Sequence, residues 1–194
     1  GVTAVQLLPI GEFNELDVHA TDESQRRQHG QGHDEVSSRR LNFWGYAPVQ
    51  PASFTPMSRY GQTPVSAPAE LKAFVKALHE QGMECYLDLV FNHVGNSSCS
   101  LHFFGVNSEY FMHSRSDPSS HSNVSGCGNT LAPNLPAMLE LVIQSLRWWV
   151  SEYHIDGYRL DAAGVLARDE KEGCLTAPPV LAAIAADPLL LDVK

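Results

Sequence analysis

Two short apolar runs of this chain end in polar side chains that could do chemistry. The first run finishes in Asp88, Asn92 and His93, and the second in Arg159 and Asp161. Strand interiors favour β-branched and aromatic residues, while Asp and Asn are depleted there, so packing alone does not account for these groups. Parallel sheets and barrels build their active sites where the strands stop. The two runs therefore predict an enzyme.

The two-residue spacing of Arg159 and Asp161 favours a nucleophilic carboxylate. Alternate side chains of a strand share one face, so we expect the guanidinium to lie beside the carboxyl group. A nearby cation favours the ionised form of an aspartate, which is the form that a nucleophile needs at neutral pH. Asp88 lies inside its run rather than after it, and we expect it to bond Arg159 rather than to act in catalysis.

The composition argues against several other classes of protein. The chain has 194 residues, 43% of them hydrophobic and 18% charged, which fits one globular domain. A formal net charge of -9 argues against a nucleic-acid partner, since such binding needs a basic face. No apolar run approaches the ~20 residues of a membrane span. Four cysteines without C-x-x-C and nine histidines without H-E-x-x-H form no metal motif, so we expect neither metal nor cofactor.

The elements that must position these residues alternate between strand and helix. Apolar runs bounded by turn residues predict strands at residues 2–9, 83–91 and 155–160. A first helix is expected to begin at a Ser66 cap and to end at Gly82. A second is expected from Pro136, capped by Asn134 or Leu135, and a helix-like stretch covers residues 178–184. The expected apolar positions are Leu71, Phe74, Val75 and Leu78 in the first helix and Leu139, Val142, Leu146, Trp149, Val150 and Tyr153 in the second.

This order predicts an α/β fold with parallel strands joined by crossovers. Three strands cannot close a barrel, which takes about eight, so the chain is either a small open sheet or a slice of a barrel. The long loops all follow strand ends, including a polar insertion at residues 19–40, and the returns to the strands are short. The sequence contains no G-x-G-x-x-G and no P-loop motif, and the loop asymmetry favours the barrel.

The segments Asp88–His93 and Gly157–Asp161 resemble two signature segments of the α-amylase superfamily of glycoside hydrolases. Their surroundings are similar to isoamylase-type starch debranching enzymes and to bacterial glycogen debranching enzymes. Several motifs in the family's order, over nearly the whole chain, make this resemblance specific. Residues 132–136 depart from it by lacking the usual histidine, which makes a substrate contact by that loop doubtful. The flanking motifs are Glu12–Leu16, Asn42–Tyr46, Ser125–Thr130 and Arg147–Val150.

The resemblance implies a (β/α)8 TIM barrel that hydrolyses α-1,6 branch linkages of starch or glycogen with retention. This chain would supply about strands two to four, with their helices and long βα loops. By the resemblance, Asp161 is the nucleophile and Arg159 orients it. His93 would grip the sugar in the cleavage subsite, Tyr46 would stack on that sugar, and Asn92 would support the neighbouring loop.

Other residues near the motifs have structural explanations of equal or greater weight. Trp44 stands beside Tyr46, and a glucan contact and a structural role are equally weighted for it. Asp156 is expected to shape the turn into its strand rather than to touch substrate. At least one of Trp148 and Trp149 is expected to pack in the core, because both fall at core-facing helical spacing.

A second carboxyl group is missing from the expected site. Retaining hydrolysis needs a protonated carboxyl group ~5–5.5 Å from the nucleophile, and the family carries it on a glutamate at the end of strand five. Glu170 and Glu172 lie in a charged loop and are poor replacements. Residues 1–194 are therefore expected to be a fragment of a catalytic barrel domain, without strands five to eight and without an N-terminal carbohydrate-binding-type domain. The fragment is expected to be inactive, since a proton donor contributes ~10²–10⁴-fold.

Three functions of the parent protein remain open at this point. The first is hydrolysis of branch linkages, with branched α-glucan such as amylopectin or glycogen as the partner. The second is a non-catalytic isoamylase-like subunit that binds glucan or regulates a homo- or hetero-oligomer of related isoamylases. The third is an α-glucan branching enzyme on the same barrel. A plastid location is expected for a plant or alga, and a cytoplasmic location otherwise.

Overall fold

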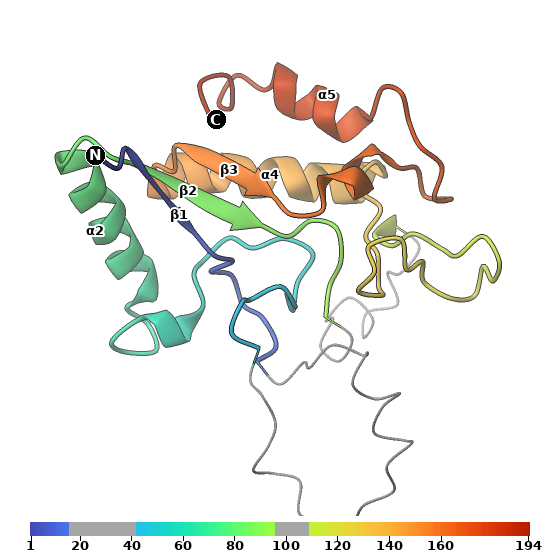
Figure 1. Cartoon of the computed structure of the whole chain (residues 1–194), viewed down its shortest axis with the longest axis horizontal. Helices are drawn as coiled ribbons and strands as arrows, with labels where there is room; N and C mark the ends of the chain where they lie inside the picture. Colours follow the sequence, from blue (N-terminus) through green and yellow to red (C-terminus); the bar gives the residue numbers. More distant parts are fainter. Residues whose placement is uncertain (16–41, 96–108) are drawn as a thin grey trace, which may run out of the picture.

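The computed structural model describes residues 1–15, 42–95 and 109–194. Its centre is a parallel sheet in the order β1-β2-β3, formed by β1 (Ala4–Leu7), β2 (Glu84–Leu89) and β3 (Gly157–Leu160). Helix α2 (Ala67–Glu80) leads into β2, and helix α4 (Pro136–Tyr153) leads into β3 (Figure 1). The predicted alternation and the parallel pairing are confirmed. The polar stretch at residues 19–40 lies entirely outside the described residues.

The register of the sheet sets the positions of the polar groups. Asp88 in β2 lies opposite Arg159 in β3, which puts the two side chains on the same face. Strands β1 and β2 are shorter at both ends than the apolar runs that predicted them, whereas β3 begins later than predicted and ends at the predicted residue. After β2, Val90 and Phe91 remain buried although they are no longer paired as strand.

The free edge of β3 carries one further pair of hydrogen bonds. Tyr158 N–H donates to the Lys194 carbonyl over 2.8 Å, and Lys194 N–H donates to the Asp156 carbonyl over 3.0 Å. This is the parallel pattern in which Lys194 stands opposite Gly157. Chain near residue 194 therefore lies along β3 on the side away from β2.

The buried face of helix α2 agrees with the prediction except at Phe74, and the start of the helix differs in its capping. Leu71, Val75 and Leu78 are buried as predicted, but Phe74 is 40% exposed and lines an open pocket together with Leu7 of β1. Ser66 stands at the N-cap position of α2, as predicted, but its side chain makes no capping bond. Ser66 already has helical dihedral angles, and its hydroxyl bonds the backbone of Thr63 instead.

The remaining helices follow the predicted signals. Gly82, with φ +69°, comes directly after the end of α2, where a left-handed residue is favoured. Helix α4 begins at Pro136 after Leu135, and the predicted positions from Val142 to Tyr153 are buried, with Val150 half-buried. Helix α5 covers Pro179–Ala186, and the short 3₁₀ helices η1 (Ser58–Tyr60) and η3 (Ala163–Ala167) lie in the loops.

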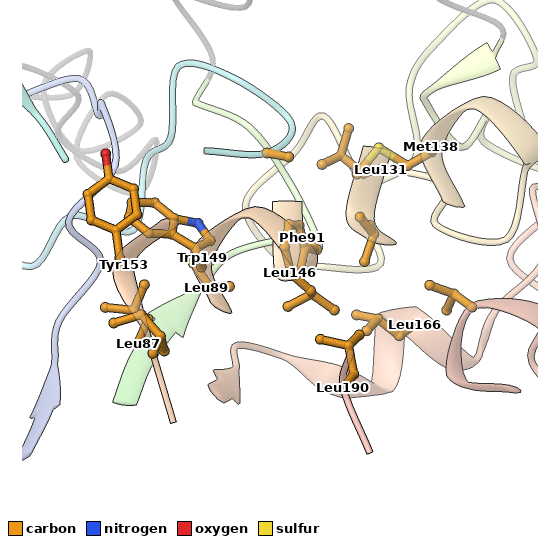
Figure 2. Close-up of a cluster of buried hydrophobic side chains, with 14 of the residues drawn as sticks. Leu87, Leu89, Phe91, Leu131, Met138, Leu146, Trp149, Tyr153, Leu166 and Leu190 are labelled. Atoms are coloured by element: carbon orange, nitrogen blue, oxygen red, sulfur yellow. The ribbon is translucent and has the colours of Figure 1, made fainter. Parts of the chain in front are cut away.

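One hydrophobic core joins the sheet to the helices. Side chains of β2 pack against the buried face of α4 (Figure 2), and Trp149 is fully buried with its indole N–H donating to the Ser53 carbonyl over 2.9 Å. Trp148 is half-exposed, so Trp149 is the packing tryptophan that the sequence predicted.

Within the described residues, no helix is long and apolar enough to cross a membrane.

Candidate active site at the ends of β2 and β3

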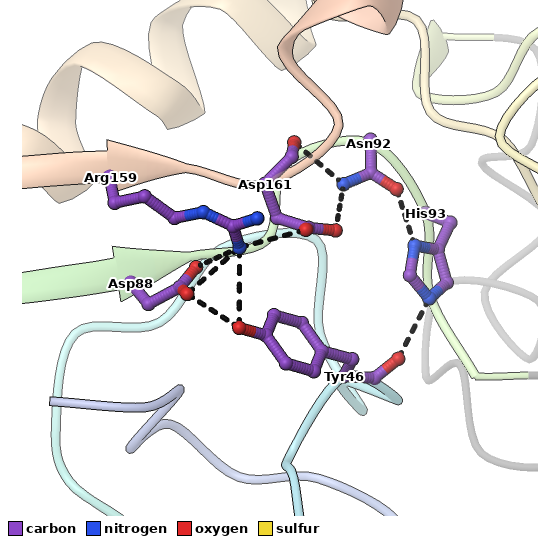
Figure 3. Close-up of polar contacts among 6 residues, drawn as sticks. All are labelled: Tyr46, Asp88, Asn92, His93, Arg159 and Asp161. Carbon is purple, nitrogen blue, oxygen red and sulfur yellow. Dashed lines mark hydrogen bonds and ion pairs between the residues drawn. The ribbon is translucent and has the colours of Figure 1, made fainter.

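The polar residues singled out in the sequence meet where β2 and β3 end. The loop after β1 approaches the same place, so three segments that are far apart in the chain contribute to one network (Figure 3). The parallel register brings the strand ends together, because neighbouring strands that run the same way stop at the same edge. The network consists of Tyr46, Asp88, Asn92, His93, Arg159 and Asp161.

Arg159 bonds two carboxylates through a single nitrogen. Its Nη1 lies 2.8 and 3.0 Å from the two oxygens of Asp88 and 2.9 Å from Oδ1 of Asp161. The bond that was expected between Asp88 and Arg159 is therefore confirmed. Hydrogen bonding to Asp88 raises the pKa of the Arg159 guanidinium, so this side chain stays charged.

Tyr46 closes the other side of Asp88. Its hydroxyl donates to Asp88 Oδ2 over 2.6 Å and accepts from Arg159 Nη1 over 3.2 Å. The guanidinium carbon also lies 5.8 Å from the centre of the Tyr46 ring, within range of a cation–π contact. Burial and then the bond to Asp88 raise the pKa of Tyr46 to about 12, so the phenol is a neutral donor.

Asn92 and His93 hold the second oxygen of Asp161 and the loop of Tyr46. Asn92 Nδ2 donates to the Asp161 carbonyl and to Asp161 Oδ2, each over 2.9 Å. His93 Nδ1 lies 2.5 Å from Asn92 Oδ1, and His93 Nε2 lies 2.9 Å from the Tyr46 carbonyl. Each oxygen of Asp161 therefore accepts a bond from a different strand end, and this fixes the plane of the carboxylate.

The structure gives Trp44 a different setting. The residue is 62% exposed, and its ring packs edge-to-face against Phe43 with ring centres 6.4 Å apart. Trp44 shares the loop of Tyr46, but none of the contacts in the network runs through its side chain. Asp156 lies at the opposite end of β3, where Oδ2 accepts from Cys85 N–H and from His79, which agrees with the structural role expected for it.

The sequence did not reveal that a later loop returns to pair with the end of β2. Leu131 N–H donates to the Asn92 carbonyl over 3.0 Å, and Thr130 lies opposite His93 in an antiparallel bridge. Residues 129–131 lie in a loop without apolar periodicity, so the sequence did not predict that they pair with the end of β2. It fixes the backbone from which two of the site side chains extend.

Asn134 also has a structural role that the sequence left open. Its Nδ2 donates to the carbonyls of Leu166 and Arg168, and its Oδ1 accepts from Val180 N–H. The loop that departs from the family pattern therefore ties the start of α4 to η3 and α5.

In the part of the chain that the structure describes, no three His, Cys, Asp or Glu side chains are grouped to hold a metal ion.

Comparisons with known proteins identify relatives of this chain. No protein-family model matches it. Across its whole length, the chain is 44% identical to isoamylase 3, chloroplastic, of Oryza sativa subsp. japonica, and 35% identical to isoamylase SU1, chloroplastic, of Zea mays. It is 34% identical to a glycogen debranching enzyme of Yersinia enterocolitica. The matched regions make up 24%, 26% and 27% of these three proteins.

Solved structures give the same result for the fold. A pullulanase of Paenibacillus barengoltzii, crystallised with maltohexaose and α-cyclodextrin, matches 85% of the chain with a TM-score of 0.65 and 32% identity, over 23% of its own length. The pullulanase of Bacillus acidopullulyticus matches 86% of the chain with a TM-score of 0.62 and 32% identity, over 18% of its length. The chain, which spans about a quarter of its curated relatives, belongs to the isoamylase-type debranching enzymes of the α-amylase superfamily.

Proposed function

We propose that the protein containing this chain is a glycoside hydrolase that cleaves α-1,6 branch linkages of starch or glycogen with retention. The observation that carries the proposal is the carboxylate of Asp161, held at a strand end by Arg159 and Asn92. The relatives support it, since they are named isoamylases and glycogen debranching enzymes. Because the chain spans only about a quarter of their length, the activity is proposed for the whole protein.

The proposed architecture is a (β/α)8 barrel in which β1, β2 and β3 are strands two, three and four. Its support is the parallel order of the sheet and the likeness to pullulanase structures. Residues 1–194 would then form part of one catalytic barrel domain, and other regions of the parent would supply the remaining strands and an N-terminal carbohydrate-binding-type domain.

The proposed mechanism follows from the two oxygens of Asp161. One oxygen attacks the anomeric carbon of the branch-point glucose while a protonated carboxyl group elsewhere in the parent donates a proton to the leaving oxygen. Water then cleaves the glycosyl–aspartate ester, with the second carboxyl group acting as base. Arg159 orients the nucleophile through its bond to Oδ1. We assign the ring of Tyr46 to the sugar of the cleavage subsite, and Trp44 to a glucan contact outside it.

The register of Lys194 predicts where the proton donor stands in the parent sequence. Lys194 stands opposite Gly157, and Asp161 follows Gly157 by four residues. If the parent chain continues along β3 in this register, the fourth residue after Lys194 lies level with Asp161. A glutamate there supports the hydrolase, whereas a side chain that cannot donate a proton favours a non-catalytic glucan-binding or regulatory subunit.

The test is product analysis on amylopectin and glycogen with the intact parent. We expect new reducing ends and released linear chains. Constant reducing ends with rearranged branch lengths would instead identify a branching transferase. Asp161→Asn should lower turnover by several orders of magnitude and leave glucan affinity largely intact, because the amide keeps the shape of the carboxylate but cannot attack. Retained turnover would refute the assignment of Asp161.

The cellular setting is proposed from the relatives alone. Two of the plant relatives are named as chloroplastic isoamylases, and we propose a plastid location if the source is a plant or alga and a cytoplasmic one otherwise. Assembly with related isoamylase subunits stays a prediction. Sedimentation of the intact parent with and without glucan would measure it.

A further inference from the structure

Lys194 and Glu84 form an ion pair across β3, on the face of the sheet that carries the candidate site. Lys194 Nζ lies 2.5 Å from Oε1 of Glu84 in β2, although the Lys194 backbone is bonded to the far edge of β3. Tyr86, two residues after Glu84, pairs with Gly157. Lys194 stands opposite the same glycine, so its side chain shares a face with Glu84 and Arg159.

The missing side chain of Gly157 makes this contact possible. A Cβ atom there would lie 2.8 Å from the ring of Tyr86, so the ring occupies that space. The Tyr86 hydroxyl donates to Oε2 of Glu84 over 2.6 Å, and Oε1 accepts from Lys194. The bonds from Lys194 and then from Tyr86 lower the pKa of Glu84, and the bond to Glu84 raises the pKa of Lys194. Both groups therefore stay charged at neutral pH.

The pair selects one register for the chain at Lys194. Backbone hydrogen bonds between parallel strands repeat with a period of two residues, so they do not distinguish registers that differ by that step. A slip of one residue would turn the Lys194 side chain to the face that packs against the helices. A slip of two residues would carry its Cα about 7 Å along β3, away from Glu84.

Stability alone is a weak explanation for this pair. The side chains of Lys194 and Glu84 are 61% and 36% exposed in the described residues, and exposed ion pairs contribute little to the free energy of unfolding. Its main consequence is geometric, since it fixes both the face and the register of the chain beside β3.

We propose that Lys194 and Glu84 are positioning residues for the proton donor of the parent, an inference that rests on the proposed hydrolase function. In the register that they select, the fourth residue after Lys194 lies level with Asp161 and on the same face of the sheet. Neighbouring strands lie about 4.8 Å apart, close to the ~5–5.5 Å between the two carboxyl groups of a retaining glycosidase. The pair thus sets the separation on which acid catalysis depends.

Two substrates of the intact parent separate proton donation from the other steps. Amylopectin needs the donor, because the leaving sugar oxygen must take up a proton. With α-maltotriosyl fluoride, the C–F bond breaks as Asp161 forms its ester, and fluoride leaves without a proton. Added azide then attacks the anomeric carbon, which releases the Asp161 carboxylate and glycosyl azide, so the second step needs no base.

Lys194→Met keeps the apolar stem of the side chain and removes its charge. We expect kcat on amylopectin to fall about 10²-fold, since a misplaced catalytic group costs about that much, while fluoride release with azide changes less than about twofold. Glu84→Gln should behave in the same way. The double variant should lose no more than Lys194→Met alone, because the two residues act as a unit. Equal losses on both substrates, or no loss on amylopectin, would overturn the proposal.

Lys72→Met provides the matched control. Lys72 is also paired with a glutamate, but its partner Glu152 belongs to α4, so this pair joins two helices rather than two strands. We expect both rates to stay unchanged. If Lys72→Met lowered amylopectin turnover as much as Lys194→Met, loss of any ion pair would explain the effect and the positioning role would be refuted.

A crystal structure of the intact parent tests the register without turnover. We expect Lys194 opposite Gly157, with Nζ within hydrogen-bond distance of Glu84. A shifted register, or Lys194 bound elsewhere, would overturn the proposal even for an active enzyme. The expected pair in a parent that releases no chains from amylopectin would refute the proposed function, and the positioning role with it.

Discussion

At the scale of single residues, the site separates two carboxylates that share one arginine. The Asp88 side chain is 2% exposed and is enclosed by Arg159 and Tyr46, whereas the Asp161 side chain is 20% exposed. The environment therefore assigns different tasks to chemically identical groups. Asp88 holds the guanidinium in place, and Asp161 keeps an open side from which a ligand can approach.

Removing the Tyr46 hydroxyl tests this division. In Tyr46→Phe, Asp88 loses a 2.6 Å hydrogen bond while the aromatic ring stays. We expect the free energy of unfolding of the intact parent to fall by about 1.5–3 kcal/mol, as for a hydrogen bond to a charged group. We also expect a lower kcat, because Arg159 becomes less well fixed. Chemical denaturation and steady-state kinetics measure the two effects, and an unchanged kcat would show that this bond does not support Asp161.

The same substitution has a pH signature. The pKa of Tyr46 is about 12 in the folded protein and about 10 in an unfolded chain. Between these values the unfolded state has lost the proton and the native state has kept it, so stability falls as pH rises. We expect the stability difference between the wild type and Tyr46→Phe to shrink from pH 9 to pH 12. A difference that stays constant would contradict the raised pKa.

At the scale of elements, β2 organises the site because β2 and the residues directly after it contact both β3 and the Tyr46 loop. Its own register sets Asp88 against Arg159, and the residues that follow it reach Asp161 and the Tyr46 loop. The return of residues 129–131 to the end of β2 fixes that backbone from the other side. Small shifts of β3 along β2 would therefore separate Asp161 from Asn92.

Gly157 has no room for a side chain between Tyr86 of β2 and the segment at Lys194. A Cβ atom there would lie 2.8 Å from the ring of Tyr86 and 3.0 Å from the carbonyl of Lys194. We expect Gly157→Ala to lower the free energy of unfolding by about 1–3 kcal/mol, as overpacking does. Chemical denaturation of the intact parent measures this loss.

Gly164 provides the matched control in the loop after the same strand. A Cβ atom at Gly164 would meet nothing within 4 Å, so Gly164→Ala should be neutral or slightly stabilising. Equal losses for the two alanine variants would mean that close packing at β3 is not the cause.

At the scale of the whole molecule, several large apolar side chains stay exposed in the described residues. Leu189 and Leu191, which follow α5, are 55% and 68% exposed, and Val2 before β1 is 73% exposed. Helix α5 consists only of apolar residues, yet Val180 is its only fully buried member. The relatives are about four times longer than this chain, so additional regions of the parent protein are the expected cover for these side chains.

Expression of the 194 residues alone tests this view. We expect self-association in size-exclusion chromatography, because exposed apolar patches and open sheet edges both favour it. We also expect no debranching of amylopectin. Leu191→Lys should reduce the association without restoring activity. A monodisperse monomer, or clear turnover of amylopectin, would contradict the view that these residues need other regions of the parent protein for packing and activity.

The sequence by itself determined the elements and the residues of the candidate site. Apolar periodicity located β2, α4 and β3 to within a few residues, and the polar groups at strand ends identified Asp161 and Arg159, because both signals are local in the chain. Phe74 was predicted to be buried but is exposed, because its surroundings include residues near β1 that are distant in the sequence. Ser66 stands at the predicted N-cap position, but its hydroxyl bonds Thr63 in the preceding turn.

The tertiary structure alone decided how the site residues are connected. That Tyr46 bonds Asp88, that Asn92 faces Asp161 and that both nitrogens of His93 meet acceptors all depend on segments separated by 40 or more residues, apart from the His93–Asn92 contact. Sequence spacing places a side chain on a face of a strand, but hydrogen-bond partners are set by register and loop return. For that reason the sequence could place His93 in the candidate site, and only the assembled network showed which atoms its ring contacts.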